Sequence, residues 1–371
     1  MQFTVDKREL EVALAKIQGV ISTYETTPVL KTYHLDIKDK VMTLFATDME
    51  LGTSVKMSLL KSTGAGDVAI PARKLNEIVK ALPGDAKIDF DIDDSARISM
   101  KSGKSSWRMS GIEGDEYPDM PTFGDDAQLW NIGRETLIVL LERTYSFVVP
   151  EADQRVGMKA VAIQKGSIMA TNGEVLCVQR HPFEVGSVEH IPGSAVRDLL
   201  AVLRNSGVAE VALMQGEEYI FIEVGEDVLF TRLLDAWEFP DVASMTSLLC
   251  PLGDTQQEWT AKVNRTGLMS TIRRVKVASD QEKKEIELQF GTGEIVLTAS
   301  TEAGDFSTES FTAKTNVEKG FAGKSVVNYM ALLDILNKAK SEHIKLWLLD
   351  SCLVIYDENI FLYYFCMRRD F

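Results

Sequence analysis

The residues able to do chemistry in this chain are few and scattered. Four histidines occur, His34, His181, His190 and His343, and none has the HExxH spacing of a zinc site. The four cysteines lie far apart without a CxxC pair, which is typical of a reducing cytosol and disfavours a zinc site. The sequence has no GxSxG nucleophile elbow. We therefore predict no enzyme activity, no cofactor and no bound metal.

Two polar segments could be taken for ligand sites. Residues 102–105 (SGKS) resemble the end of a phosphate-binding loop, but Ile98 stands where the pattern requires a glycine five residues before Gly103. The segment lies between two strand-like runs, so a hairpin turn is the better prediction. The aspartates of the run 91–94 could bind a cation, yet they alternate with apolar residues at a strand end. A solvated strand face is the simpler expectation there.

Composition sets the class of protein and the number of domains. The chain has 371 residues, of which 45% are hydrophobic and 26% charged, as in soluble globular proteins. At roughly 100–200 residues per domain, two or three domains are expected. No apolar run is long enough to span a membrane, and the first residues lack the pattern of a signal peptide, so we expect a cytoplasmic protein. The net charge of −15 argues, taken alone, against nucleic-acid binding.

Short motifs recur at intervals of about one third of the chain. The tripeptide 46–48 (ATD) follows a strand-like run and is nearly repeated at 170–172 (ATN). The other recurrences are 117–119 (YPD) with 239–241 (FPD), Pro71 with Pro192, and a fainter third copy near 294–300. Three copies of one domain would fill the chain. The predicted domains are residues 1–122, 127–249 and 255–371, with linkers near 121–126 and 250–254.

Periodicity predicts two helices and several strands in each copy. Apolar residues spaced i, i+3, i+4 and i+7 mark six amphipathic helices. They span residues 6–18, 72–82, 134–146, 193–205, 265–278 and 328–340. Between them apolar and charged residues alternate, as at Ile88, Phe90 and Ile92, which predicts strands. The sequence therefore predicts an α+β fold of three repeated, sheet-rich domains with two helices each.

Charge is divided unevenly between the helices and the rest of the chain. The six predicted helices hold 16 basic and 8 acidic residues, although the whole chain is acidic. If all six helices face one side, that side is positive. Ordinary solvated helix faces explain the same count equally well, so charge alone leaves both interpretations open.

Several longer runs resemble the bacterial DNA polymerase III beta subunit, the sliding clamp. The runs are 45–51 (FATDMEL), 70–75 (IPARKL), 170–173 (ATNG), 233–235 (LLD), 239–241 (FPD) and 363–368 (YYFCMR), in order from the start of the chain to its end. The resemblance implies the DNA clamp fold, with two chains joined head to tail in a six-domain ring that encircles duplex DNA. It implies a processivity factor that tethers the DNA polymerase III alpha subunit, the clamp loader, other polymerases and repair proteins through linear motifs.

The resemblance also assigns residues to three surfaces. The implied peptide-binding groove between the second and third domains comprises Met158, Thr171, Gly173, Leu176, Pro240, Met245, Asn328, Cys352, Val354, Tyr364, Phe365, Met367 and Arg368. The cations expected to face DNA are Arg73, Lys80, Arg143, Arg197, Arg204, Arg273, Arg274, Lys276 and Lys338. The expected dimer seam includes Lys74, Trp107, Met109, Val277 and Ala278. Core packing is an equally open interpretation for Leu176, Val354 and Trp107.

The chain departs from the family pattern within the groove. Where many relatives have Asp-Gly-His-Arg, this chain has Asn172-Gly173-Glu174-Val175, which replaces a cation by an acid and an apolar residue. A Met-Pro-Met near the end is replaced by Phe365-Cys366-Met367. We therefore expect a shifted peptide preference. Two other hypotheses stay open at this stage: a monomeric, β-rich binding module with duplicated repeats, and a hydrolase with a diffuse site.

Overall fold

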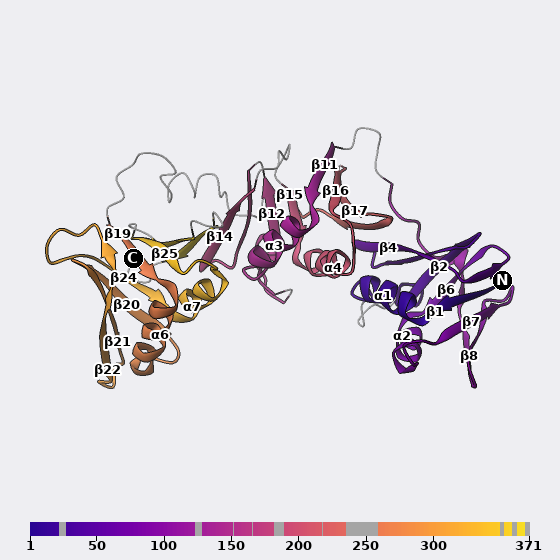
Figure 1. Cartoon of the computed structure of the whole chain (residues 1–371), viewed down its shortest axis with the longest axis horizontal. Coiled ribbons are helices and arrows are strands. Elements are labelled where there is room, and N and C mark those ends of the chain that lie inside the picture. The colour runs from indigo at the N-terminus through magenta and orange to yellow at the C-terminus, as the bar shows by residue number, and fades with distance from the viewer. Residues whose placement is uncertain are drawn as a thin grey trace. The chain divides into compact units, whose positions relative to one another are not determined.

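The computed structural model describes residues 1–21, 27–122, 128–150, 152–164, 166–181, 189–216, 218–234, 259–348, 352–357 and 362–367. The chain forms two compact units (Figure 1). The first comprises Met1–Leu141 and Ile191–Leu234, and the second Glu142–His190 and Asp235–Phe371.

The first unit contains two sheets whose described strand pairs are all antiparallel. One has the strand order β5 (Lys61–Thr63), β1 (Gln2–Asp6), β7 (Lys87–Ile92), β8 (Arg97–Ser102), β9 (Ser105–Ser110). The other has the order β10 (Ile112–Glu113), β6 (Gly66–Pro71), β2 (Thr32–Lys38), β3 (Val41–Thr47), β4 (Leu51–Ser58), β18 (Asp227–Arg232), β17 (Tyr219–Val224), β16 (Glu210–Gln215), β11 (Gln128–Gly133). Buried apolar residues alternate along these strands, as in Ile88, Phe90 and Ile92, and face the helices.

The second unit also contains two sheets. The larger has the order β15 (Glu189–Pro192, which ends past the unit boundary), β12 (Ala160–Gln164), β13 (Ser167–Thr171), β14 (Val175–Arg180), β27 (Leu362–Met367), β26 (Cys352–Asp357), β25 (His343–Leu348), β19 (Trp259–Asn264), β23 (Lys314–Thr315). The smaller has the order β22 (Phe306–Thr312), β21 (Glu294–Ser300), β20 (Glu285–Gly291), β24 (Phe321–Asn328).

Six α-helices occur in the described residues, where the periodicity predicts them. They are α1 (Lys7–Ile17), α2 (Ala72–Ala81), α3 (Arg134–Tyr145), α4 (Gly193–Arg204), α6 (Arg265–Val275) and α7 (Tyr329–Lys338). Asp6 and Asn328 lie just outside the observed helices because they are N-caps, whose side chains accept hydrogen bonds from the first free backbone N–H groups. The last turn predicted for α6 is instead a 3₁₀ turn, Lys276–Ala278.

The order of elements along the chain repeats three times, which confirms the predicted fold class. A strand leads into a helix (β1–α1, β11–α3, β19–α6), further strands follow, and a second strand leads into a second helix (β6–α2, β15–α4, β24–α7). Three strands then close each repeat: β7–β9, β16–β18 and β25–β27. The strand pairings repeat as well, since β1, β11 and β19 each pair with the first of their three closing strands.

Two joints connect successive repeats through the same antiparallel register. In the first unit β4 pairs with β18, and Gly52 stands opposite Phe230. In the second unit β14 pairs with β27, and Leu176 stands opposite Phe365. Gly52 and Leu176 are equivalent, because each also pairs with the last residue of the strand before it. Phe230 and Phe365 are both the fourth residue of the last strand of a repeat.

These joints explain why the compact units do not coincide with the predicted domains. Each large sheet combines strands of two repeats, so the second repeat is divided between the units. The boundaries 1–122, 127–249 and 255–371 stay a prediction. Most of the first predicted linker and all of the second lie outside the described residues.

The segment 102–105 is a hairpin between β8 and β9, with Gly103 at a positive φ of 57°, as predicted. Among the described residues, no helix is long and apolar enough to cross a membrane.

Candidate functional site

The turn between β13 and β14 is built by the side chains of its own motif. Thr171 Oγ1 donates to the carbonyl of Val175 (2.9 Å) and accepts from the N–H of Gly173 (3.0 Å). Asn172 Oδ1 accepts from the N–H groups of Glu174 and Val175. Gly173 has φ of +86°, a conformation that side chains rarely adopt. The motif thus fixes a tight turn that carries Glu174 at its end.

The first repeat uses its copy of the motif in the same way. Thr47 Oγ1 donates to Leu51 and accepts from the N–H of Met49, while Asp48 Oδ1 accepts from the N–H of Leu51. Met49 has φ of 79°. The recurrence that revealed the repeats therefore has a local structural cause, and Thr171 and Gly173 are explained by turn geometry without a ligand.

Asn328 joins this turn to α7. Its Oδ1 caps the helix by accepting from the N–H groups of Met330 (2.8 Å) and Ala331 (3.3 Å). The cap orients the amide so that Nδ2 donates to Glu174 Oε1 at 2.9 Å. Met158 lies beside the turn: its Sδ is 3.6 Å from the position that a Cβ on Gly173 would occupy. The structure thus brings four predicted groove residues, Met158, Thr171, Gly173 and Asn328, together at the turn that carries Glu174.

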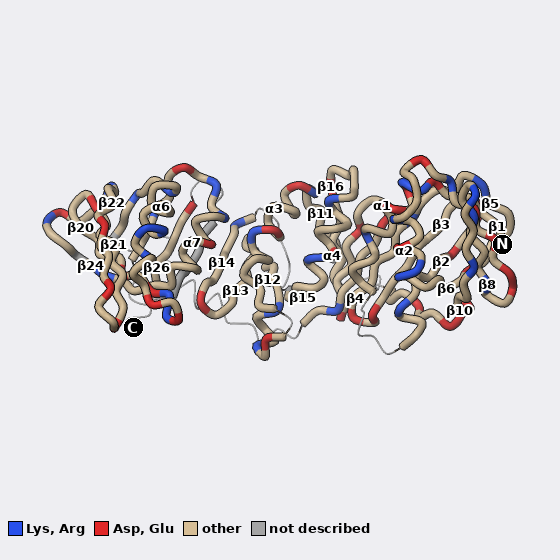
Figure 2. Tube along the Cα trace, turned by 90° about the horizontal axis from the view of Figure 1, so that it is seen from below, with Lys and Arg blue, Asp and Glu red and all other residues tan. Residues whose placement is uncertain are grey.

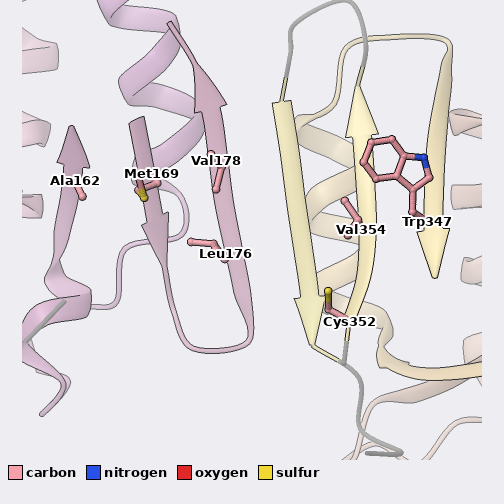
Figure 3. Close-up of a cluster of buried hydrophobic side chains, with 7 residues drawn as sticks. All are labelled: Ala162, Met169, Leu176, Val178, Trp347, Cys352 and Val354. Atoms are coloured by element: carbon pink, nitrogen blue, oxygen red, sulfur yellow. The ribbon is translucent and has the colours of Figure 1, made fainter. Parts of the chain in front are cut away.

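A cluster of buried apolar side chains covers one face of the larger sheet of this unit (Figure 3). It contains the predicted groove residues Leu176, Cys352 and Val354, all buried. The other members of the cluster, which the sequence analysis did not single out, lie on β12, β13, β14 and β25: Ala162, Met169, Val178 and Trp347. Alternation along the strands places them on this face, but which strands are neighbours is not visible from sequence. Burial fits either core residues or the floor of a groove.

The last strand lies between the two halves of this cluster. In the register of β27, Phe365 stands opposite both Leu176 and Val354, and Met367 opposite Cys352. Tyr364 is on the opposite face of the sheet from the cluster. Tyr363, which the sequence analysis did not select, stands opposite Val178 and Tyr356. The predicted groove residues Pro240, Met245 and Arg368 lie outside the described residues.

Two buried cysteines lie in this sheet, Cys352 within the cluster and Cys177 on β14 outside it. Cys177 and Cys352 are fully buried and reduced. Burial raises the pKa of the Cys177 thiol far above its ordinary value, so little thiolate forms near neutral pH. Within the described residues, no group of His, Cys, Asp or Glu has the arrangement of a metal site. Asp93 of the acidic run 91–94 accepts from Arg97 at 2.9 Å.

The cations predicted to face DNA are on helices, and Figure 2 shows Lys and Arg positions along α2 and α6. Lys80, Arg204 and Arg273 are exposed, as are the three arginines that form ion pairs, while Arg143, Lys276 and Lys338 are half-buried. The ion pairs are Arg73–Glu77 (2.9 Å), Arg197–Asp198 (3.3 Å) and Arg274–Glu309, and Lys276 Nζ lies 5.4 Å from the centre of the Tyr329 ring.

Arg274 is the most constrained of these cations. Its Nε donates to Glu309 Oε2 at 2.9 Å, and its Nη2 donates to Glu309 Oε1 and to Thr271 Oγ1. The hydrogen-bonded guanidinium lowers the pKa of Glu309, and the carboxylate raises that of Arg274. Because Glu309 is on β22, this bidentate pair connects α6 to the edge strand of its sheet.

The predicted seam residues lie on the edge strand β9 and on α2 in the first unit, and in the 3₁₀ turn after α6 in the second. Trp107 (half-buried) and Met109 (buried) are on β9, the last strand of its sheet, and Lys74 is exposed on α2. Val277, 79% exposed, and half-buried Ala278 are in the 3₁₀ turn that packs against β21 and β22. Trp107 is thus neither fully buried core nor free surface.

Comparison with known proteins supports the resemblance. Residues 1–121 match the family model described as "DNA polymerase III beta subunit, N-terminal domain". The beta sliding clamp of Pseudomonas putida is 26% identical over 363 residues, covering 95% of this chain and 94% of that protein. The beta sliding clamp of Proteus mirabilis is 24% identical over 370 residues, covering 97% and 96%.

Solved structures agree on the fold. The sliding clamp (DNA polymerase III subunit beta) of Pseudomonas aeruginosa, bound to griselimycin, matches with a TM-score of 0.87 at 22% identity, covering 99% of both chains. The DNA polymerase sliding clamp of Caulobacter crescentus matches with a TM-score of 0.86 at 20% identity and the same coverage. Along nearly its whole length this chain is similar in sequence to bacterial beta sliding clamps, and its fold is that of the solved sliding-clamp structures.

Proposed function

We propose that this chain is a DNA sliding clamp, a non-catalytic processivity factor that closes head to tail as a homodimeric ring around duplex DNA. One observation carries the proposal. Each internal joint pairs a strand of one repeat with the last strand of the next, and among the described strands the two that remain without such a joint, β22 and β9, lie at sheet edges. An open sheet edge invites another strand. Pairing β22 of one chain with β9 of a second repeats the joint and satisfies both edges.

The helix cations support the DNA part of the proposal. A ring lined by helices would present exposed cations such as Lys80, Arg204 and Arg273 to phosphates without reading sequence. The predicted helices hold eight more basic than acidic residues, so the acidic excess behind the net charge of −15 lies outside them and disfavours DNA contacts elsewhere. Closure, rather than affinity, holds the clamp on DNA. The proposed setting is the nucleoid of the cytoplasm.

The sheet that joins the second and third repeats supports the peptide-binding part. Its apolar cluster offers adaptable Met, Leu and aromatic contacts to hydrophobic anchors of a linear motif, and Glu174 with Asn328 offers polar contacts beside it. The proposed partners are the alpha subunit of DNA polymerase III, the clamp loader, other polymerases and repair proteins. A tethered polymerase gains effective concentration at the primer end.

Retention on DNA tests the topological mechanism. The clamp is loaded on nicked circular plasmid DNA, passed over a sizing column, and then treated with an enzyme that makes one double-strand cut. The proposal predicts retention on the circle and loss within minutes after the cut. A circle cut and then blocked at both ends by bound protein is the control, and it should retain the clamp. Equal retention on open circles and open linear DNA would refute encirclement.

Peptide capture tests the groove separately. The Met158→Ala variant removes a half-buried side chain beside Gly173 and should weaken capture of the alpha subunit of DNA polymerase III about tenfold or more. Met49→Ala, at the equivalent turn of the first repeat, is the matched control and should bind normally. Normal binding by both variants would move the partner site elsewhere.

A further inference from the structure

We infer that the seam between two chains has the register of the internal joints and that this register places Arg108 of one chain against Phe306 of the other. The inference rests on the proposed ring and adds the residue pairing and the chemistry of its closure. Both residues are at sheet edges in the described structure, on β9 and β22.

The register follows from equivalences within the chain. Each internal joint pairs β4 or β14 of one repeat with the last strand of the next repeat, β18 or β27. In both joints, one residue of β4 or β14 pairs with the last residue of the strand before it. That same residue stands opposite the fourth residue of β18 or β27. On β22 the residue paired with the last residue of β21, Ser300, is Phe306. On β9, the last strand of the first repeat, the fourth residue is Arg108. The rule therefore sets Phe306 opposite Arg108, Ser307 opposite Trp107, and Thr308 opposite Ser106.

The faces of the strands agree with this register. Arg108 is exposed, between half-buried Trp107 and buried Met109, which face the helix side of their sheet. Phe306 is 66% exposed, and its neighbour Ser307 is half-buried. Directly opposite residues of an antiparallel pair share a face, so the exposed residues meet on the outer face and Trp107 meets Ser307 on the inner one. The small serine leaves room for the indole ring.

The chemistry of the seam differs from that of the internal joints. The first joint sets Phe230 against Gly52, and the aromatic ring is buried in a cluster with Phe45, Phe221 and Tyr117. At the seam the aromatic residue is on the opposite strand and a cation replaces it on β9. The Arg108 side chain lines a surface hollow with Asp91 and Asp93, and within the described residues it forms no side-chain hydrogen bond or ion pair, so its guanidinium is available to lie over the Phe306 ring. Such a cation–π pair holds the two strands together without burying an aromatic core. A seam of this kind suits a ring that has to open.

Cross-linking tests the register. In the full-length chain, Ser106→Cys combined with Thr308→Cys places two thiols directly opposite each other, and mild oxidation should give covalent dimers on a non-reducing gel. Ser106→Cys combined with Ser310→Cys shifts one thiol by two residues on the same face and should give few. Each single variant measures background from the native cysteines. Efficient cross-linking of the shifted pair in preference to the direct pair would overturn the inference.

Dimer dissociation tests the chemistry. Phe306→Leu keeps an apolar side chain but removes the aromatic ring. Because each dimer has two seams, the substitution should raise the dimer dissociation constant about 5- to 30-fold. Arg108→Gln should raise the dimer dissociation constant by a similar factor, and Arg108→Lys should raise it much less. The double variant should lose less binding free energy than the two single variants lose together. Lys101→Gln, on the adjacent strand β8, is the matched control and should have no effect.

The outcomes separate the two proposals. A parent chain that sediments as a monomer at micromolar concentration would overturn both the ring and the pairing. A parent chain that dimerises, with unchanged dissociation constants for Phe306→Leu and Arg108→Gln, would overturn the pairing and leave the ring in place. Unchanged melting temperatures exclude misfolding as the cause of any loss.

Discussion

Asp198 is a buried carboxylate that the fold of the first unit tolerates at a cost. It is on α4, which packs against α1, and its side chain is 5% exposed. Its Oδ1 lies 3.3 Å from Arg197 Nε and against the backbone of Gly19, where a Cβ would be only 2.0 Å away. Its Oδ2 has no hydrogen-bond partner. Gly19 follows the C-terminal end of α1, whose partial negative charge also disfavours a carboxylate.

Replacing this carboxylate by an amide should therefore stabilise the protein. A buried polar atom without a partner costs about 1–3 kcal/mol, so we expect Asp198→Asn to raise the free energy of unfolding by about 1–2 kcal/mol at pH 8. Asparagine has nearly the same shape and directs an N–H group toward carbonyls at the end of α1. The gain should come without any change in fold.

The gain should depend on pH in a defined direction. Burial, with a smaller contribution from the nearby Asp48, raises the pKa of Asp198 above its ordinary value of 3.8, while Arg197 opposes the shift. Between 3.8 and the raised pKa, the folded state binds more protons than the unfolded state, so the stability of the parent protein falls as pH rises through that window. The advantage of Asp198→Asn should vanish below the window and be complete above it.

Asp227 provides a control of opposite sign in the same unit. Its Oδ2 pairs with Lys16 Nζ at 2.6 Å, both side chains are largely buried, and its Oδ1 accepts from the N–H of Lys56. Asp227→Asn leaves a buried ammonium without its partner and should cost about 3 kcal/mol. Urea unfolding followed by circular dichroism at pH 5 and pH 8, with hydrogen exchange of α1 amides, measures both variants. A loss of stability in Asp198→Asn at pH 8, or a gain that grows toward low pH, would refute the reasoning.

Three further predictions concern packing and capping. Asn328→Ala removes the cap of α7 and should lower the free energy of unfolding by about 1–2 kcal/mol, whereas Asn328→Ser should keep most of it; equal melting temperatures for all three proteins would contradict the cap. Gly52→Ala would place a Cβ 2.3 Å from the Phe230 ring and should cost about 1–3 kcal/mol in chemical unfolding, and a neutral result would mean that the joint can widen. Cys177 and Cys352 should resist a thiol reagent in the native protein and react in urea; fast native labelling of either would show that the larger sheet of the second unit opens.

Local patterns made much of the fold predictable. The six helices occur within a few residues of their predicted bounds, because the apolar stripe and the capping residues both belong to the segment itself. The repeats were detectable because the turn at Thr171 and Gly173 requires its own residue types. The hairpin at Gly103 followed from turn chemistry in the same way.

Features that depend on which distant strands meet could not be predicted. Nothing in the sequence indicates that β14 neighbours β27, so the cluster members Val178 and Trp347 were not singled out. The Arg274–Glu309 pair joins residues 35 positions apart, and sequence alone assigned Arg274 to the DNA-facing set. Charge counting gives the sign of a helix face but not the partners of each side chain.

The central claim is that two copies of a three-repeat chain close into a ring with an opening wide enough for duplex DNA. Negative-stain electron microscopy of the purified protein, with the mass of the same sample measured by light scattering, tests it most directly. The account predicts annular particles with a central hole and a mass of twice 41.3 kDa. Solid particles without an opening, or a mass of 41.3 kDa at micromolar concentration, would contradict it.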